Sequence, residues 1–280
     1  MYLAHWELKQ RPFDNLLDTK FAFFSEQYRE AIARLVYTIK EAKGGAVLYG
    51  EYGSGKSLVR SLLMERLNEL DQFQSVVITH PNLPTSELYA LILTELQEEG
   101  TPPPLHLTRY LLLREIRDRL RSIGEQGRST VLIVDEAQSI RDDQALEDIR
   151  MLLNIHEESQ NAPLILILIG QQSLIDRLAN IPPLLQRLPV RWRLMPLDAS
   201  QTAQYIAHRL RAAGGRADLF TPEAIEAVHA QSGGIPRVIN NICDLALLAG
   251  FMQGATSISL NVVKNAIQEL QISEPTSLGS

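Results

Sequence analysis

Short apolar runs alternate along the first two thirds of the chain with longer segments whose apolar residues recur at helical spacing. The runs occupy residues 45–49, 75–79, 130–134, 164–169 and 190–195, and the helical segments between them include 58–70, 86–98 and 108–123. This alternation predicts a parallel sheet covered by helices on both faces, an α/β sandwich of three layers. Ligands of such sheets bind beyond the carboxyl ends of the strands. Residues that follow the predicted strands are therefore the first candidates for a functional site.

The pattern becomes purely helical after Pro196. Candidate helices cover residues 200–213, 221–231, 236–253 and 261–271. The sequence Thr221-Pro222-Glu223 offers an N-cap, a proline at the first helical position and an acidic first turn, so this helix start is well marked. We expect an α/β domain with an N-terminal arm over residues 1–195, a small all-α domain over 196–272 and a frayed tail over 273–280.

The net charge and the number of cysteines exclude some classes of protein. The 280 residues carry a net charge of −6, so no overall basic field draws the chain to nucleic acid or to an anionic membrane. Cys243 is the only cysteine, which excludes a disulfide framework and suits a reducing compartment; we expect it in the core. The longest apolar run, from Leu164 to Ile169, is too short to span a bilayer. The chain is expected to be cytoplasmic.

The helix expected over residues 108–123 carries charges of both signs. Arg114, Arg117 and Arg121 lie near one face, but Glu115 and Asp118 are interleaved among them. We interpret this face as solvated, with contact to DNA as the alternative.

The stretch after the first strand has the pattern of a phosphate-binding loop. It reads Gly50-Glu51-Tyr52-Gly53-Ser54-Gly55-Lys56-Ser57 and matches G-x-x-x-x-G-K-[S/T] between a strand and a helix. The glycines let backbone N–H groups turn toward phosphate, Lys56 would reach the β- and γ-phosphates, and Ser57 would bind Mg²⁺. The predicted nucleotide-binding residues are Gly50, Glu51, Tyr52, Gly53, Ser54, Gly55, Lys56, Ser57 and Leu58.

Polar residues also follow the third and fourth strands. Asp135 would meet the Mg²⁺ held by Ser57, and Glu136 would polarise the attacking water. Gln171, after the fourth strand, is a candidate contact to the γ-phosphate or the water. The alternatives are an acidic pair at the mouth of a strand without a catalytic role and an ordinary loop glutamine.

With these motifs in place, the chain resembles the AAA+ ATPases, and within them the ExeA type associated with secretion and pilus assembly. The resemblance runs over nearly the whole length, from Met1-Tyr2 through Pro12-Phe13, Phe24-Ser25, the phosphate loop, Asp135-Glu136-Ala137-Gln138 and Gly170-Gln171. It continues through Gln186-Arg187-Leu188 to the segment from Ser232 to Asn240.

The resemblance implies a P-loop NTPase fold followed by a helical lid, with three further roles: a γ-phosphate sensor, a lid arginine and an arginine finger. Gln171 stands where the γ-phosphate sensor would be, and Arg237 stands where a lid arginine would reach the nucleotide. Arg187 falls in the region of the arginine finger offered to a neighbouring subunit, with Arg191 and Arg193 as close rivals. A surface arginine at position 237 and a structural ion pair at position 187 are the alternatives.

The function implied is an ATPase that converts ATP and water to ADP and phosphate with Mg²⁺ and assembles with itself into a ring or filament. It would couple turnover to a secretion or type IV pilus machine. The alternative is a regulator similar to TnsC, which assembles with ATP on duplex DNA and recruits a transposase. No membrane span is expected.

Overall fold

A computed structural model describes residues 1–16, 18–97, 107–154 and 164–273. The contacts among these residues divide the chain into two compact units. An α/β unit contains residues Glu26–Tyr52 and Val59–Leu194, and a helical unit contains Met1–Ser25, Gly53–Leu58 and Met195–Ser280. The predicted domain limits stay a prediction.

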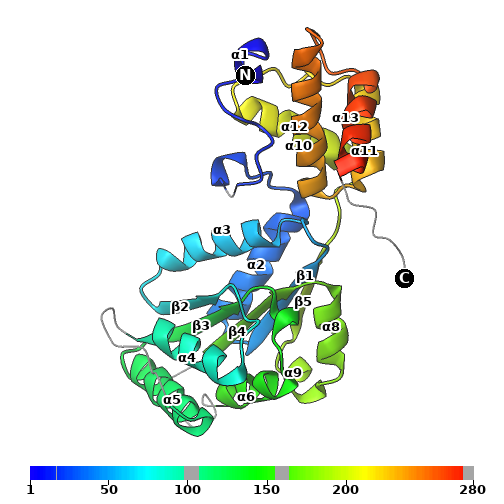
Figure 1. Cartoon of the computed structure of the whole chain (residues 1–280). Helices are drawn as coiled ribbons and strands as arrows, with labels where there is room; N and C mark the ends of the chain where they lie inside the picture. The colour runs from blue at the N-terminus through cyan, green and yellow to red at the C-terminus, as the bar shows by residue number, and fades with distance from the viewer. Residues whose placement is uncertain (17, 98–106, 155–163, 274–280) are drawn as a thin grey trace, which may run out of the picture. The chain divides into compact units, whose positions relative to one another are not determined.

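The α/β unit is built on a five-stranded sheet (Figure 1). Its strands are β1 (Gly45–Gly50), β2 (Phe73–Ile78), β3 (Ser129–Val134), β4 (Leu164–Gly170) and β5 (Val190–Leu194). They lie in the order β2-β3-β4-β1-β5, and every neighbouring pair is parallel. The predicted parallel sheet is therefore confirmed, and all five apolar runs form strands.

Helices cover both faces of this sheet, as Figure 1 shows. Those on one face are α2 (Glu26–Lys40) and α3 (Lys56–Asn68), and those toward the other are α4 (Thr85–Leu96), α5 (Arg109–Glu125), α6 (Asp143–Leu153), α8 (Gln172–Ala179) and α9 (Pro182–Gln186). Alternate strand residues supply the two cores: Leu132 and Val134 of β3 pack with α4, α5 and α6, while Val131 and Ile133 point the opposite way. The predicted three-layer sandwich is confirmed.

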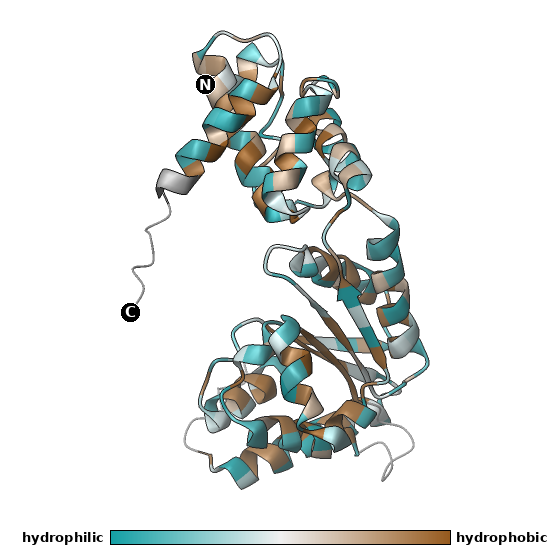
Figure 2. Cartoon of the chain, turned by 90° about the vertical axis from the view of Figure 1, so that its right-hand side faces the viewer, coloured by the Kyte–Doolittle hydropathy of each residue, from teal (hydrophilic) through white to brown (hydrophobic). Residues whose placement is uncertain are grey.

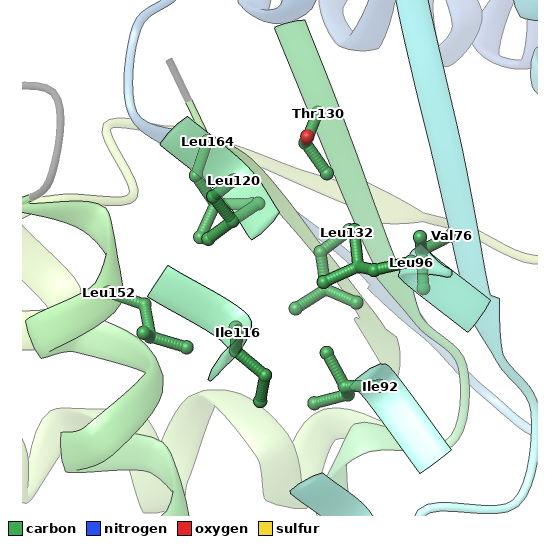
Figure 3. A pocket seen from close by; sticks show the side chains of 9 residues that line it. All are labelled: Val76, Ile92, Leu96, Ile116, Leu120, Thr130, Leu132, Leu152 and Leu164. Atoms are coloured by element: carbon green, nitrogen blue, oxygen red, sulfur yellow. The ribbon is translucent and has the colours of Figure 1, made fainter. Parts of the chain in front are cut away.

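The core between the sheet and helices α4, α5 and α6 contains a void of about 10 Å³. The side chains around it are almost all apolar, and Figure 3 shows them converging from strands and helices. They are Val76, Ile92, Leu96, Ile116, Leu120, Thr130, Leu132, Leu152 and Leu164. A space of this size is at the lower limit for one water molecule, so it offers no room for a substrate.

The helical unit confirms the four helices expected after Pro196. They are α10 (Ala199–Ala212), α11 (Pro222–Ser232), α12 (Pro236–Met252) and α13 (Leu260–Ser273). The α11 start follows the sequence signal, because the Thr221 hydroxyl accepts a hydrogen bond from the Ala224 N–H at 3.3 Å. Figure 2 shows hydrophobic and hydrophilic residues alternating along these helices, as expected for elements with one buried face.

The N-terminal arm packs within the helical unit. It contains the short helices α1 (Tyr2–His5) and η1 (Thr19–Phe21). The Trp6 indole N–H donates to the Leu247 carbonyl at 2.9 Å, and the buried Arg209 guanidinium donates to the carbonyls of Pro12 at 2.5 Å and Asp14 at 2.8 Å. The prediction attached this arm to the α/β domain; the structure groups it with α10 and α12 because these buried hydrogen bonds fix it there.

Several local predictions differ from the structure or lie outside it. Strand β2 begins two residues before the predicted run, and helices α6, α8 and α9 were not predicted. The turn at Gly100 and Pro102–Pro104 and the tail after Ser273 lie outside the described residues.

Cys243 is fully buried, as expected. Within the described ranges, no helix has the length and apolar character needed to cross a membrane.

Candidate functional site

Three chain segments named by the sequence analysis leave the sheet at one edge. Strand β4 pairs with β1 on one side and with β3 on the other, and all three strands are parallel. Their carboxyl ends therefore lie along the same edge, where Gly50 closes β1, Asp135 follows β3 and Gln171 follows β4. This edge is where a sheet of this class binds its ligands.

The loop after β1 has the backbone that its glycines predict. Gly53 and Gly55 adopt φ values of 80° and 96°, a left-handed region that side chains disfavour. The Leu58 N–H donates to the Gly55 carbonyl at 3.0 Å as α3 begins at Lys56. Lys56 is only 5% exposed. Glycines in this conformation before a helix N-terminus direct N–H groups toward a bound anion.

Gly53 also lies against the start of helix α12. The Arg237 N–H donates to the Gly53 carbonyl at 3.3 Å, and a Cβ at position 53 would lie 2.7 Å from the Arg237 Cβ. Gly53 therefore allows a close approach as well as an unusual backbone angle. The structure places Arg237, the predicted lid arginine, directly beside the loop.

The acidic pair occupies the end of β3. Asp135 is 6% exposed, and its backbone N–H donates to the Ile78 carbonyl at 2.8 Å. Its carboxylate forms an ion pair with Arg60, with Nε 3.2 Å from Oδ2, and accepts the Glu136 N–H at Oδ1 at 3.0 Å. The sequence analysis missed Arg60; its place four residues after Lys56, on the same face of α3, was the available signal.

Glu136 has an unusual backbone conformation. Its φ of 51° is left-handed, which a non-glycine residue seldom adopts. The turn is held because the Glu136 carbonyl accepts the Ser139 N–H at 2.8 Å and the Ser139 hydroxyl at 2.7 Å. Strained residues cluster at functional sites, so this observation favours a functional role for Glu136 over a plain acidic pair.

Gln138 is a further residue that the sequence analysis did not assign. It lies in the 3₁₀ turn η2 (Ala137–Ser139), and its side chain contacts both Glu136 and the backbone of Gln171. Gln138 belongs to the Asp135-Glu136-Ala137-Gln138 motif, but its spacing alone gave it no chemical role. Through this contact the structure brings together the predicted water-orienting residue and the predicted sensor.

The three arginine-finger candidates lie in or just before the edge strand β5. Arg187 follows helix α9 as its C-cap residue, and its carbonyl lies so close to Gly44 that a Cβ at position 44 would be 2.7 Å away. The Arg191 guanidinium donates to the carbonyls of Leu188 at 3.1 Å and Leu185 at 3.3 Å. Arg193 is exposed. Arg191 thus contacts the backbone of the segment just before its own strand.

Metal binding requires a donor set that suits the ion. Among the residues the structure describes, no three His, Cys, Asp or Glu side chains gather as a protein-only metal site. Mg²⁺ at a phosphate loop needs fewer protein ligands. One hydroxyl and one carboxylate are enough, because phosphate oxygens and water molecules supply the other ligands. Ser57 and Asp135 offer these two groups, so the residues present fit the ion.

Comparison with known proteins gives a family match and a curated relative. Residues 39–178 match the family model described as AAA domain. The chain is 35% identical over 260 residues to General secretion pathway protein A of Aeromonas hydrophila, covering 92% of this chain and 46% of that protein. It therefore spans less than half the length of this relative. The expected relation to the ExeA type is confirmed.

Solved structures agree on the fold. The ORC2 protein of Aeropyrum pernix, in ADPNP and ADP complexes, superposes with a TM-score of 0.65 at 17% identity, covering 93% of this chain and 72% of that one. The RuvB Holliday junction branch migration motor of Thermotoga maritima superposes with a TM-score of 0.58 at 16% identity, covering 94% and 74%. At these identities the likeness concerns the fold alone.

Proposed function

Because the chain belongs to the AAA domain family, we propose that it binds ATP at the loop 50–58 and hydrolyses it to ADP and phosphate. The observation that carries hydrolysis rather than binding alone is Glu136, held in a left-handed turn at the end of β3 with its carboxylate bound by Gln138. A carboxylate held in a fixed orientation can orient the attacking water and accept its proton.

In this proposal each residue has one task. Backbone N–H groups of the loop and the Lys56 ammonium bind the phosphates. Ser57 and Asp135 would hold Mg²⁺, and the ion would neutralise charge on the phosphoryl group. Glu136 orients the attacking water and accepts its proton. Gln171 contacts the γ-phosphate, and Arg237 reports its presence to the helical unit, which we propose acts as the lid.

We also propose that active sites are completed between copies of the chain. Arg187 remains our candidate for the finger in a ring or filament, with Arg191 and Arg193 as its rivals. Mixing Arg187→Ala with Glu136→Gln protein tests this, since each supplies the group that the other lacks. Activity should return in mixed assemblies, and mixed assemblies without activity would exclude Arg187.

The proposed process is secretion or type IV pilus assembly, with other components of that machine as partners. Its support is the match to General secretion pathway protein A, which extends over 92% of this chain. The alternative, assembly on duplex DNA with a transposase, has no comparable support, and the pairing of Arg114 with Glu115 at 3.0 Å favours the solvated interpretation of helix α5. We propose that the protein acts in the cytoplasm, because ATP is available there.

Calorimetric titration with ATP and Mg²⁺, together with phosphate release, tests the proposed ATPase. Lys56→Ala should lose most affinity, because it removes the buried cation of the loop. Lys43→Ala is the matched control, since Lys43 is an exposed lysine just before β1, and it should bind as the parent does. If both variants bind ATP like the parent, or the parent neither binds nor hydrolyses ATP, the proposed function is wrong.

A further inference from the structure

The side chain of Gln138 connects the ends of two neighbouring strands. Its Nε2 donates to Glu136 Oε2 at 2.5 Å, and its Oε1 accepts the Gln171 backbone N–H at 3.1 Å. Glu136 follows β3 and Gln171 follows β4. One amide group therefore joins the carboxylate assigned to water with the segment assigned to the γ-phosphate.

The orientation of this amide is fixed by its partners. A backbone N–H can only donate, so the oxygen of the Gln138 amide must face Gln171. The amide nitrogen then faces the Glu136 carboxylate, which accepts. In the reversed orientation the amide N–H would face the Gln171 N–H, and the amide oxygen would face the Glu136 carboxylate, so neither hydrogen bond could form.

The surroundings of Gln138 hold it in this position. Gly170 leaves room for the amide, because a Cβ at that position would lie 2.5 Å from Gln138 Oε1. The Arg177 guanidinium donates to the Gln138 carbonyl at 3.3 Å and forms an ion pair with Asp143 at 2.7 Å. Ala137, in the same turn, is fully buried. Both the side chain and the backbone of Gln138 are thus fixed.

We propose that Gln138 is the positioning residue for Glu136. By binding Oε2, the amide fixes the orientation of a flexible side chain and directs its other oxygen, Oε1, as the acceptor for water. Through Oε1 of its own amide, Gln138 also sets the position of Glu136 relative to Gln171. This inference rests on the proposed ATPase function and names a residue that acts through Glu136 without touching the substrate.

The substitution Gln138→Met removes the amide and keeps a side chain of similar length. ATP affinity and KM should stay within about twofold, while kcat falls by about 10- to 100-fold, as for other residues that orient a catalytic group. Gln138→Glu keeps an oxygen for Gln171 but faces Glu136 with a second carboxylate. Its kcat should be at least as low as that of Gln138→Met.

Gln144→Met is the matched control. Gln144 is likewise a glutamine of the α/β unit whose Nε2 donates to a carboxylate, here Asp148 Oδ1 at 2.9 Å. The chemical change is the same in both variants, and each loses a hydrogen bond from an amide to a carboxylate; Gln138→Met also removes the acceptor of the Gln171 N–H. Gln144→Met should keep the kcat of the parent. If kcat falls only in Gln138→Met, the fall depends on where the hydrogen bond lies, because both variants remove an amide that binds a carboxylate.

The decisive experiment combines Gln138→Met with Glu136→Gln and measures single-turnover hydrolysis of bound ATP. If Gln138 acts through Glu136, the double variant should be no slower than Glu136→Gln alone. A full further loss of about 10- to 100-fold in the double variant, or a parent-like kcat for Gln138→Met beside a slow Glu136→Gln, would overturn the inference and leave the ATPase intact. A parent that hydrolyses no ATP would overturn both.

Discussion

Two carboxylates of the α/β unit, Asp148 and Glu136, are each held by a glutamine, yet they differ in what surrounds them. Asp148 of α6 is bound from helices α4, α5 and α6 through both of its oxygens. It accepts hydrogen bonds from Tyr89 at 2.5 Å, from Gln144 at 2.9 Å and from Arg109 at 2.8 Å and 2.5 Å. Glu136 is held through Oε2 by Gln138, in a left-handed turn at the carboxyl edge of the sheet.

The difference shows how the same side-chain chemistry serves stability in one place and reaction in the other. Burial alone would raise the pKa of Asp148, but the hydrogen bonds from Arg109, Tyr89 and Gln144 outweigh it and lower the pKa below its usual value of 3.8. Because both oxygens of Asp148 accept hydrogen bonds, this carboxylate connects helices α4, α5 and α6. A carboxylate fixed through one oxygen keeps its orientation and can act on water.

The largest expected effect is a difference in the rate of ATP hydrolysis between variants of the two carboxylates. Glu136→Gln should keep ATP binding while phosphate release falls by about 10² to 10⁴, because the water loses its general base. Asp148→Asn should release phosphate within about twofold of the parent, once corrected for folded protein. Similar losses in the two variants would mean that Glu136 has no special role.

A smaller loss of turnover is expected from Gly170→Ala. The added Cβ would lie 2.5 Å from Gln138 Oε1 and 2.8 Å from Leu174 Cδ2, so the amide must move and release Glu136. A displacement of about 1 Å at a catalytic group can cost up to about 10² in rate. We expect kcat to fall toward that of Gln138→Met with KM retained; a parent-like kcat would show that the amide tolerates the methyl group.

Asp148→Asn should instead reduce stability. The amide retains one oxygen acceptor but places N–H groups against the Arg109 guanidinium, which can only donate, so at least one charge-assisted hydrogen bond is lost at a site where the side chain of Asp148 is 8% exposed. We expect the free energy of unfolding to fall by about 1 to 3 kcal/mol. Urea denaturation of the parent, Asp148→Asn and Gln144→Met measures it, and Gln144→Met should lose less.

The smallest effect concerns pH. Because the folded-state pKa of Asp148 is lowered, its contribution to stability is complete above its unfolded pKa of 3.8 and is lost as pH falls through the folded value. The stability difference between the parent and Asp148→Asn should therefore be constant near pH 6 and shrink below about pH 4. Urea midpoints measured across this range check it, and a difference that grows on acidification would contradict the lowered pKa.

The sequence predicted the sheet and the phosphate loop because local pattern determines both. An apolar run such as 164–169 has the length of a buried strand and is too short for a core helix. Gly53 and Gly55 occupy the positions where a phosphate loop needs left-handed backbone. Helix α6 was missed although Asp142 precedes apolar residues at helical spacing. The strand order also remained open, because the pairing of β4 with both β1 and β3 joins segments far apart in sequence.

Residues whose role comes from tertiary contact escaped the sequence analysis. Arg60 matters through Asp135, and Gln138 through Glu136 and Gln171, and no spacing rule relates these partners. The same holds for Arg209, which fixes the N-terminal arm through backbone carbonyls of Pro12 and Asp14. Carbonyl acceptors are present at every residue, so the sequence cannot identify which of them a buried arginine binds.

The most direct test of the proposed ATPase site is an experimental structure of Glu136→Gln protein with ATP and Mg²⁺. The substitution keeps the phosphate and metal ligands while slowing turnover by about 10² to 10⁴, so intact ATP should be present in the site. We expect the phosphates in the loop 50–57 with Lys56 on the β- and γ-phosphates, and Mg²⁺ bound by Ser57 and close to Asp135. Nucleotide bound away from this loop, or Mg²⁺ that contacts neither residue, would contradict the assignment.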